Sequence, residues 1–165
     1  MFSQSHYRFS ELKTLFIHDD GSLPDFYFEK LTAEQVCVLY NWLRSRGGIF
    51  GEPLVWDTEQ KRDVLVTNEL PAAERVVSGR YQNFRHGLNR LEMNGVIIPQ
   101  LTVEVTPDLI CIDYRAGAEW GDQEIVAMME LLRTLQQFAP DAELFHMFEG
   151  EERTSWFPDV WKRIV

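Results

Sequence analysis

The sequence predicts an α+β fold, with a mixed or mainly antiparallel sheet and two principal helices packed on it. Apolar residues recur at helical spacing in two segments, about 33–46 and 122–138. Short runs of β-forming residues lie before, between and after these segments. With 165 residues, the chain is long enough for one well-buried core and short for two. We therefore expect residues 1–165 to form a single globular domain.

The first predicted helix begins at a capping box. Thr32 and Gln35 stand three positions apart, so the Thr32 side chain can accept from the Gln35 amide while Gln35 reaches back. Gly47 and Gly48 follow the last apolar position and are expected to end the helix. The apolar positions between them share one face: Val36, Leu39, Tyr40 and Leu43.

The second predicted helix has the most regular apolar stripe of the chain. It should begin at Gly121 or Asp122, which suit the N-cap, and end before Pro140. Its apolar face consists of Ile125, Met128, Met129, Leu132 and Leu135.

The strand predictions centre on a hairpin, in which residues 101–105 and 109–114 flank a turn at 106–108. Alternation in its first strand places Thr102 and Glu104 on a solvated face. Further strands are expected at 26–28, 53–56, 64–67 and 144–148, with helical turns at 71–77 and 156–164. The rest of 1–30 is expected to be irregular, and 80–92 fits either helix or irregular structure.

Negative charge is concentrated in one third of the chain. Residues 104–159 carry 13 acidic residues against three arginines, while the remainder holds 13 acids and 13 bases. Charge of one sign repels itself unless a partner of opposite sign offsets it. The pattern therefore indicates a field directed at a basic partner.

Composition also excludes several classes of partner and location. A pI near 4.8 disfavours direct binding to nucleic acid or to an anionic membrane, because both need basic residues. Apolar runs reach five residues, far below the roughly 20 that span a bilayer, and residues 1–13 lack the apolar core of a secretory signal. Cys37 and Cys111 lie in apolar runs and are expected to be free thiols, which favours the cytoplasm.

The sequence offers no catalytic motif. It has no glycine-rich phosphate loop, no dinucleotide fingerprint, no paired-cysteine or His-Glu-x-x-His zinc spacing, and no Gly-x-Ser-x-Gly turn. We accordingly predict no catalytic residue, no cofactor and no metal site. These absences remove several enzyme classes and leave others open.

The preferred hypothesis is a non-catalytic module that binds a basic protein through an acidic surface. Carboxylates would speed encounter, while tryptophans in desolvated pockets would supply binding energy. The predicted partner-binding residues are Glu119, Trp120, Asp122, Glu143, Glu149, Glu151, Glu152 and Trp156. In the alternative interpretation the tryptophans belong to the core and the acids only keep the protein soluble.

A small, acidic α+β protein without catalytic motifs is similar in general profile to bacterial immunity proteins, which neutralise basic toxin domains such as nucleases. The resemblance is one of overall character and carries no residue over. It implies that the basic partner is a toxin domain.

A rival hypothesis is an enzyme or small-ligand binder that holds an anionic substrate. Arg75, Arg80, Arg85 and Arg90 recur every five residues, and their planar groups suit phosphate or carboxylate. His86 or a carboxylate would serve as the base. On a helix this spacing scatters the side chains, so they converge only if the segment is irregular; otherwise they pair with the acidic half. A structural or assembly subunit is a third hypothesis.

Overall fold

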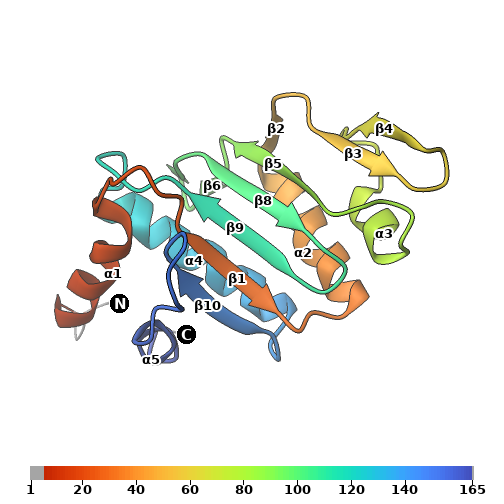
Figure 1. Cartoon of the computed structure of the whole chain (residues 1–165). Helices are drawn as coiled ribbons and strands as arrows, with labels where there is room; N and C mark the ends of the chain where they lie inside the picture. Colours follow the sequence, from red (N-terminus) through yellow and green to blue (C-terminus); the bar gives the residue numbers. More distant parts are fainter. Residues whose placement is uncertain (1–5, 165) are drawn as a thin grey trace.

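The computed structural model describes residues 6–164 and confirms the α+β prediction. Its central element is a six-stranded sheet in which all neighbouring strands are antiparallel (Figure 1). Across the sheet the strands are β10 (Glu143–Met147), β1 (Asp25–Glu29), β9 (Ile110–Tyr114), β8 (Leu101–Val105), β5 (Phe84–Asn89) and β2 (Gly48–Phe50).

The two predicted helices cover one face of this sheet. Helix α2 (Ala33–Arg46) begins at the predicted capping box, and α4 (Asp122–Phe138) begins after Gly121. Both cross behind the sheet in Figure 1 and contact each other. Their apolar stripes pack against inward-facing strand residues such as Phe26, Ile112 and Val103, which are completely buried. Burial of these two stripes is the main source of stability for the fold.

Smaller elements surround this core. The hairpin of β3 (Leu54–Asp57) and β4 (Arg62–Leu65) lies beside α3 (Ala72–Val77) at one side of the molecule (Figure 1). The hairpin of β6 (Glu92–Met93) and β7 (Val96–Ile97) packs on α4, and α5 (Phe157–Trp161) packs beside β10. No helix in this described part of the chain is long and apolar enough to cross a membrane.

Two sequence expectations were wrong. Helix α1 (His6–Ile17) occupies part of the segment expected to be irregular, of which residues 1–5 lie outside the described residues. Its buried residues, Leu12, Leu15 and Phe16, have helical spacing, but they are few, and exposed apolar residues such as Ile17 blur the stripe. Strand β5 occupies part of 80–92, where the polar His86 takes the buried position between Phe84 and Leu88 and hides the alternation.

The second face of the sheet is not covered by any described helix (Figure 1). We call it the open face. Its side chains are those that alternate with the side chains facing the helices along each strand. The open face consists of Glu143, Phe145 and Met147 from β10; Asp25, Tyr27 and Glu29 from β1; Cys111 and Asp113 from β9; Thr102 and Glu104 from β8; Arg85, Gly87 and Asn89 from β5; and Gly48 and Phe50 from β2.

Candidate functional site

Three loops meet at one end of the sheet, where β1 begins and where β9 and β10 end. We call residues 18–24, 115–121 and 148–156 together the acidic loop end. The backbone N–H of Leu23 donates to the Glu149 carboxylate at 3.1 Å, and the Arg115 guanidinium lies 3.6 Å from the Asp19 carboxylate. Segments distant in sequence are thus tied together here.

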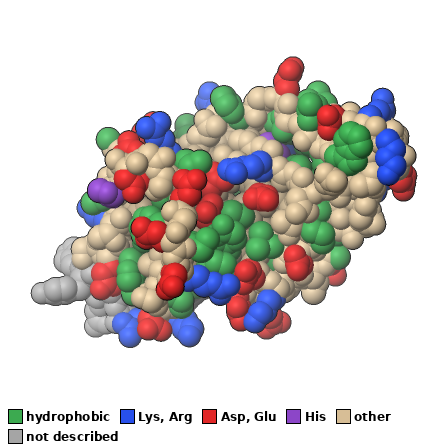
Figure 2. Space-filling view, in the orientation of Figure 1, with side chains coloured by type: hydrophobic (Ala, Val, Ile, Leu, Met, Phe, Trp, Pro, Cys, Tyr) green, Lys and Arg blue, Asp and Glu red, His purple; other side chains and the backbone are tan. Residues whose placement is uncertain are grey.

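The acidic loop end and the open face form one continuous acidic side. Burial is the main cause of the raised Asp25 pKa, and the Glu149 charge is close enough to add to it. Acidic and hydrophobic side chains lie next to one another across the front of the sheet, with few basic ones between them (Figure 2). The carboxylates of this side are Asp19, Asp20, Asp25, Glu29, Glu104, Asp113, Glu119, Glu143, Glu149, Glu151 and Glu152. Its cations are Arg85, Arg115 and Arg153, to which we add Lys30, because this residue follows β1 and pairs with Glu143.

An aromatic pair lies on the open face within this acidic side. The rings of Tyr27 and Phe145 face each other across β1 and β10, with centroids 4.9 Å apart and planes 8° from parallel. The Arg153 guanidinium lies 3.7 Å from the Phe145 ring centroid and donates to the Glu29 carboxylate at 2.9 Å. A cation over an aromatic ring is attracted by the ring quadrupole. This part of the open face therefore already binds one guanidinium.

Asp113 is a buried carboxylate on the same face. It is 4% exposed and forms an ion pair with Arg85 on β5. Burial raises the Asp113 pKa to about 6, against the opposing effect of the Arg85 charge. Desolvation disfavours the ionised form more than one half-exposed guanidinium favours it.

Asp25, the strand neighbour of Asp113, is half-buried and has no cationic partner among the described residues. Its carboxylate accepts from the Tyr27 hydroxyl at 3.2 Å and from the Cys111 thiol at 3.5 Å. Burial raises the pKa of Asp25. Burial also raises the pKa of Cys111 well above its usual range, so this thiol is protonated and is a poor nucleophile at neutral pH.

The structure brings together part of the predicted acidic surface. Glu119, Glu149, Glu151 and Glu152 are exposed in the acidic loop end. Glu143 belongs to the open face but lies at the far end of β10, where its carboxylate is 2.5 Å from the Lys30 ammonium.

Asp122 lies outside the acidic loop end, whereas Trp156 lies within it but is not fully exposed. Asp122 starts α4 and pairs with Lys13 of α1 at 2.5 Å. Trp156 is half-buried against the core.

The structure corrects the prediction for Trp120, which is a core residue. It is 4% exposed, and its ring centroid lies 4.6 Å from that of Phe16 and 5.3 Å from that of Tyr114. Its indole N–H donates to the Arg115 carbonyl at 2.8 Å. Because α1 folds over the turn before α4, the tryptophan is covered by a segment that the sequence predicted to be irregular rather than helical.

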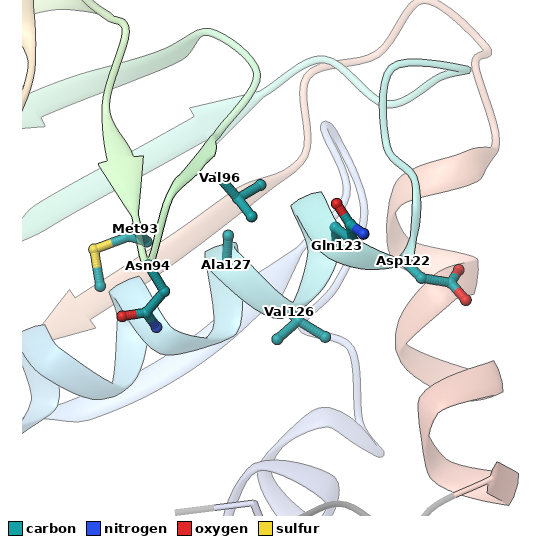
Figure 3. Close-up of a pocket in the computed structure, with 7 residues that line it drawn as sticks. All are labelled: Met93, Asn94, Val96, Asp122, Gln123, Val126 and Ala127. Atoms are coloured by element: carbon teal, nitrogen blue, oxygen red, sulfur yellow. The ribbon is translucent and has the colours of Figure 1, made fainter.

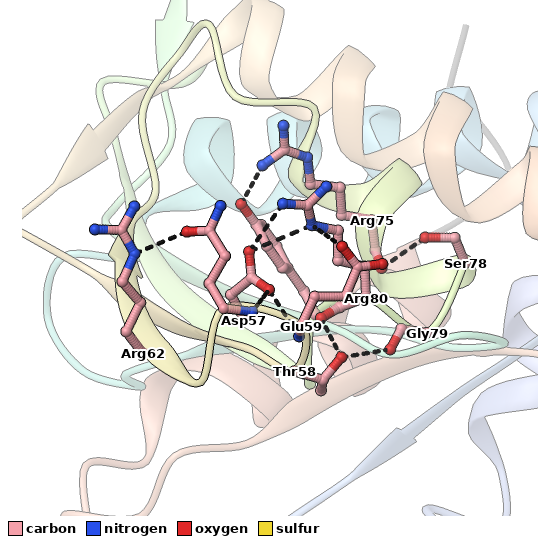
Figure 4. A network of polar contacts seen from close by, with 10 residues as sticks. Asp57, Thr58, Glu59, Arg62, Arg75, Ser78, Gly79 and Arg80 are labelled. Carbon is pink, nitrogen blue, oxygen red and sulfur yellow. Dashed lines mark hydrogen bonds and ion pairs between the residues drawn. The ribbon is translucent and has the colours of Figure 1, made fainter.

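The structure does not bring the four candidate arginines together. Arg75 on α3 donates to the Tyr81 hydroxyl, and Arg80 lies 3.3 Å from the buried Asp57 carboxylate (Figure 4). Arg85 projects from the open face, and Arg90 follows the end of β5. Three of these groups thus have internal partners, and the predicted anion site does not form.

A shallow groove of about 340 Å³ lies between the β6–β7 hairpin and the first turns of α4 (Figure 3). Its walls are mainly apolar, and the titratable group at its rim, Asp122, points away from the hairpin toward α1 (Figure 3). Among the side chains that the structure describes, no three or more His, Cys, Asp or Glu are grouped so that they could hold a metal ion. The open face is the stronger candidate site because charge, aromatic rings and buried carboxylates meet there.

Sequence reasoning missed Asp25, Tyr27, Cys111, Asp113 and Phe145 as site residues of the open face, and it assigned Arg85 to a different site. A period of two was readable in β1 and β9, where polar residues alternate with apolar ones. The spatial order of the strands was not readable, so their shared face could not be assembled.

No family model matches the chain, and no curated protein matches it. A solved structure, the toxic C-terminal tip of CdiA from Pseudomonas aeruginosa in complex with immune protein, has a similar outline. The match covers 80% of this chain and 92% of that chain, with a TM-score of 0.48 and 15% sequence identity. At this distance, the likeness carries neither residues nor an activity over to the present chain.

Proposed function

We propose that this protein is a non-catalytic module that binds a basic protein partner, and that it is of the immunity type, whose partner is a toxin domain. The observation that supports this proposal is the one-sided charge of the fold. The acidic side holds 11 carboxylates against four cations, whereas the rest of the chain holds 15 against 12. A toxin tip bound to an immune protein, as in the complex named above, is a pairing of the proposed kind.

The physical role of this charge is to guide a basic partner toward one side of the molecule. Complementary fields raise association rates, and their effect weakens as salt screens them. Several carboxylates of the acidic loop end, among them Glu119, Glu151 and Glu152, form no ion pair within the described residues and remain available. The free thiols of Cys37 and Cys111 suit a reducing compartment, so the proposal places the protein in the cytoplasm.

The test begins with recovery of the native partner by affinity purification at low and high salt, followed by binding kinetics with the purified pair. The variant Glu149→Gln/Glu151→Gln/Glu152→Gln should lower the association rate constant by about tenfold at low salt. The matched control, Glu34→Gln/Glu69→Gln/Glu92→Gln, makes the same charge change outside the acidic side and should change that rate less than about twofold.

The proposal predicts a basic partner whose binding weakens as salt rises. A neutral or acidic partner, or equal effects of the two triple variants, would contradict it. Failure to recover any specific partner would count against it in the same way.

A further inference from the structure

The open face carries a guanidinium-binding arrangement that the molecule's own arginines occupy in two places. Arg153 lies on Phe145 and pairs with Glu29, and Arg85 pairs with Asp113. Both arrangements place a planar cation over the sheet, next to a carboxylate. The first arrangement combines an aromatic ring with a carboxylate, and the same combination occurs on this face at Tyr27.

Tyr27 stands between Asp25 and Glu29 on the same strand and on the same face. Its ring is only half-buried, whereas its stacking partner Phe145 is 6% exposed and lies under Arg153. A flat, partly exposed ring beside two carboxylates has the chemistry that selects a guanidinium rather than an ammonium group.

The two oxygens of the half-buried Asp25 carboxylate each accept a hydrogen bond, but only from neutral donors. It accepts from the Tyr27 hydroxyl and the Cys111 thiol but pairs with no cation in the described part of the chain, although Glu29 and Asp113 on either side do. Neutral donors stabilise a carboxylate less than charged ones. A cation from a binding partner could pair with Asp25 at a small further desolvation cost, because this carboxylate is already partly desolvated.

We infer that the open face is the docking surface for the basic partner, and that an arginine of that partner lies on Tyr27 and pairs with Asp25. This inference rests on the proposed function. Charge complementarity favours a basic partner on this face, because its strand residues include five carboxylates and one cation, Arg85. The acidic loop end steers the partner, and the Tyr27–Asp25 position anchors it.

The inference is tested with a defined probe, the hexapeptide amide Gly-Arg-Gly-Arg-Gly-Arg, and its lysine counterpart. Each is titrated into the isotope-labelled full chain at low salt, and chemical shifts are followed by NMR. The arginine peptide should shift resonances of residues 25–29, 111–113 and 143–147 most, and should do so at lower concentration than the lysine peptide.

Two variants define the anchor. Asp25→Asn and Tyr27→Leu should each weaken binding of the arginine peptide by about threefold or more. Asp141→Asn is the matched control, because it removes one exposed carboxylate outside the acidic side and should have little effect. Circular dichroism and thermal melting establish that each variant is folded.

Several results would overturn the inference: shifts confined to the acidic loop end, no shifts at all, or equal weakening by Asp25→Asn and Asp141→Asn. The first and third would leave the proposed function intact, because charge-guided binding would still occur at another part of the acidic side. The proposed function is tested separately by the recovery experiment, and it fails if the native partner recovered there is not basic.

Discussion

Asp57 and Asp113 are both buried, and each is paired with an arginine, yet their pKa values shift in opposite directions. Asp57 lies at the end of β3, where the backbone N–H groups of Gln60 and Glu59 both donate to its carboxylate at 2.9 Å (Figure 4). These donors and the Arg80 guanidinium lower the Asp57 pKa. Burial raises the Asp113 pKa to about 6 despite the pairing with Arg85.

The difference follows from where each carboxylate stands in the backbone. A turn presents free N–H groups that can point at a side chain, as the turn after β3 does. Asp113 lies on a strand that is paired on both sides, by β1 and β8, so the main-chain groups around it bond to neighbouring strands. In a turn, backbone N–H groups therefore stabilise the ionised carboxylate. On a sheet face, that stabilisation has to come from nearby cations.

By this contrast, we interpret Asp57–Arg80 as a structural ion pair and Asp113–Arg85 as part of a recognition surface. The Asp57–Arg80 pair joins the β3–β4 hairpin to the segment after α3, where the Thr58 hydroxyl also donates to the Arg80 carbonyl at 2.8 Å. The Asp113–Arg85 pair instead links two strands, β9 and β5, that already belong to one sheet, and its arginine is half-exposed. Three predictions test this interpretation.

The largest effect is expected for Asp57→Ala. Two backbone N–H groups and one guanidinium lose their acceptor in a buried position, so the Tm should fall by roughly 5–10 °C. Thermal melting followed by circular dichroism measures it. Glu59→Ala is the control, because the Glu59 carboxylate is 66% exposed and lies 3.5 Å from Arg80. If the two variants melt at the same temperature, the structural role given to Asp57 is wrong.

A smaller effect of opposite sign is expected for Asp113→Asn. The folded-state pKa of Asp113, about 6, lies above the usual value of 3.8, so ionisation of this group opposes folding above pH 6. The neutral amide removes that penalty and should stabilise the protein by about 1–2 kcal/mol at pH 7.5. The gain should vanish as pH falls from 6 to 4, because the native carboxyl is then protonated in the folded state.

Denaturant unfolding of the unchanged protein and of Asp113→Asn between pH 4 and pH 8 measures the difference in their free energies of unfolding. The comparison cancels the pH dependence of groups that the two proteins share. A destabilised Asp113→Asn at pH 7.5 would show that the Arg85 pairing outweighs desolvation.

The smallest effect is expected for Arg85→Met. Loss of the neighbouring cation should raise the Asp113 pKa further, while the free energy of unfolding changes by less than about 1 kcal/mol because Arg85 is half-exposed. Carboxyl NMR titration reports the pKa, and denaturant unfolding reports the stability. Arg80→Met is the matched comparison and should cost more, because the Arg80 side chain is 30% exposed against 53% for Arg85. Equal costs would remove the distinction between the two pairs.

The sequence by itself determined the local elements whose signals lie within a few residues. The capping box at Thr32 and the apolar stripe of 122–138 predicted two helices with their observed bounds, and the hairpin at 101–114 was read in the same way. The excess of carboxylates in 104–159 was also readable, since charge is a property of composition.

Tertiary structure alone decided which of these residues meet. Asp25 and Asp113 are strand neighbours although 88 positions separate them, and Trp120 is buried because α1 covers it. Strand order depends on how the whole chain packs its apolar surface, which no local pattern encodes. The acidity was therefore visible in the sequence, but the open face and its Tyr27–Asp25 position exist only once β1, β9 and β10 lie side by side.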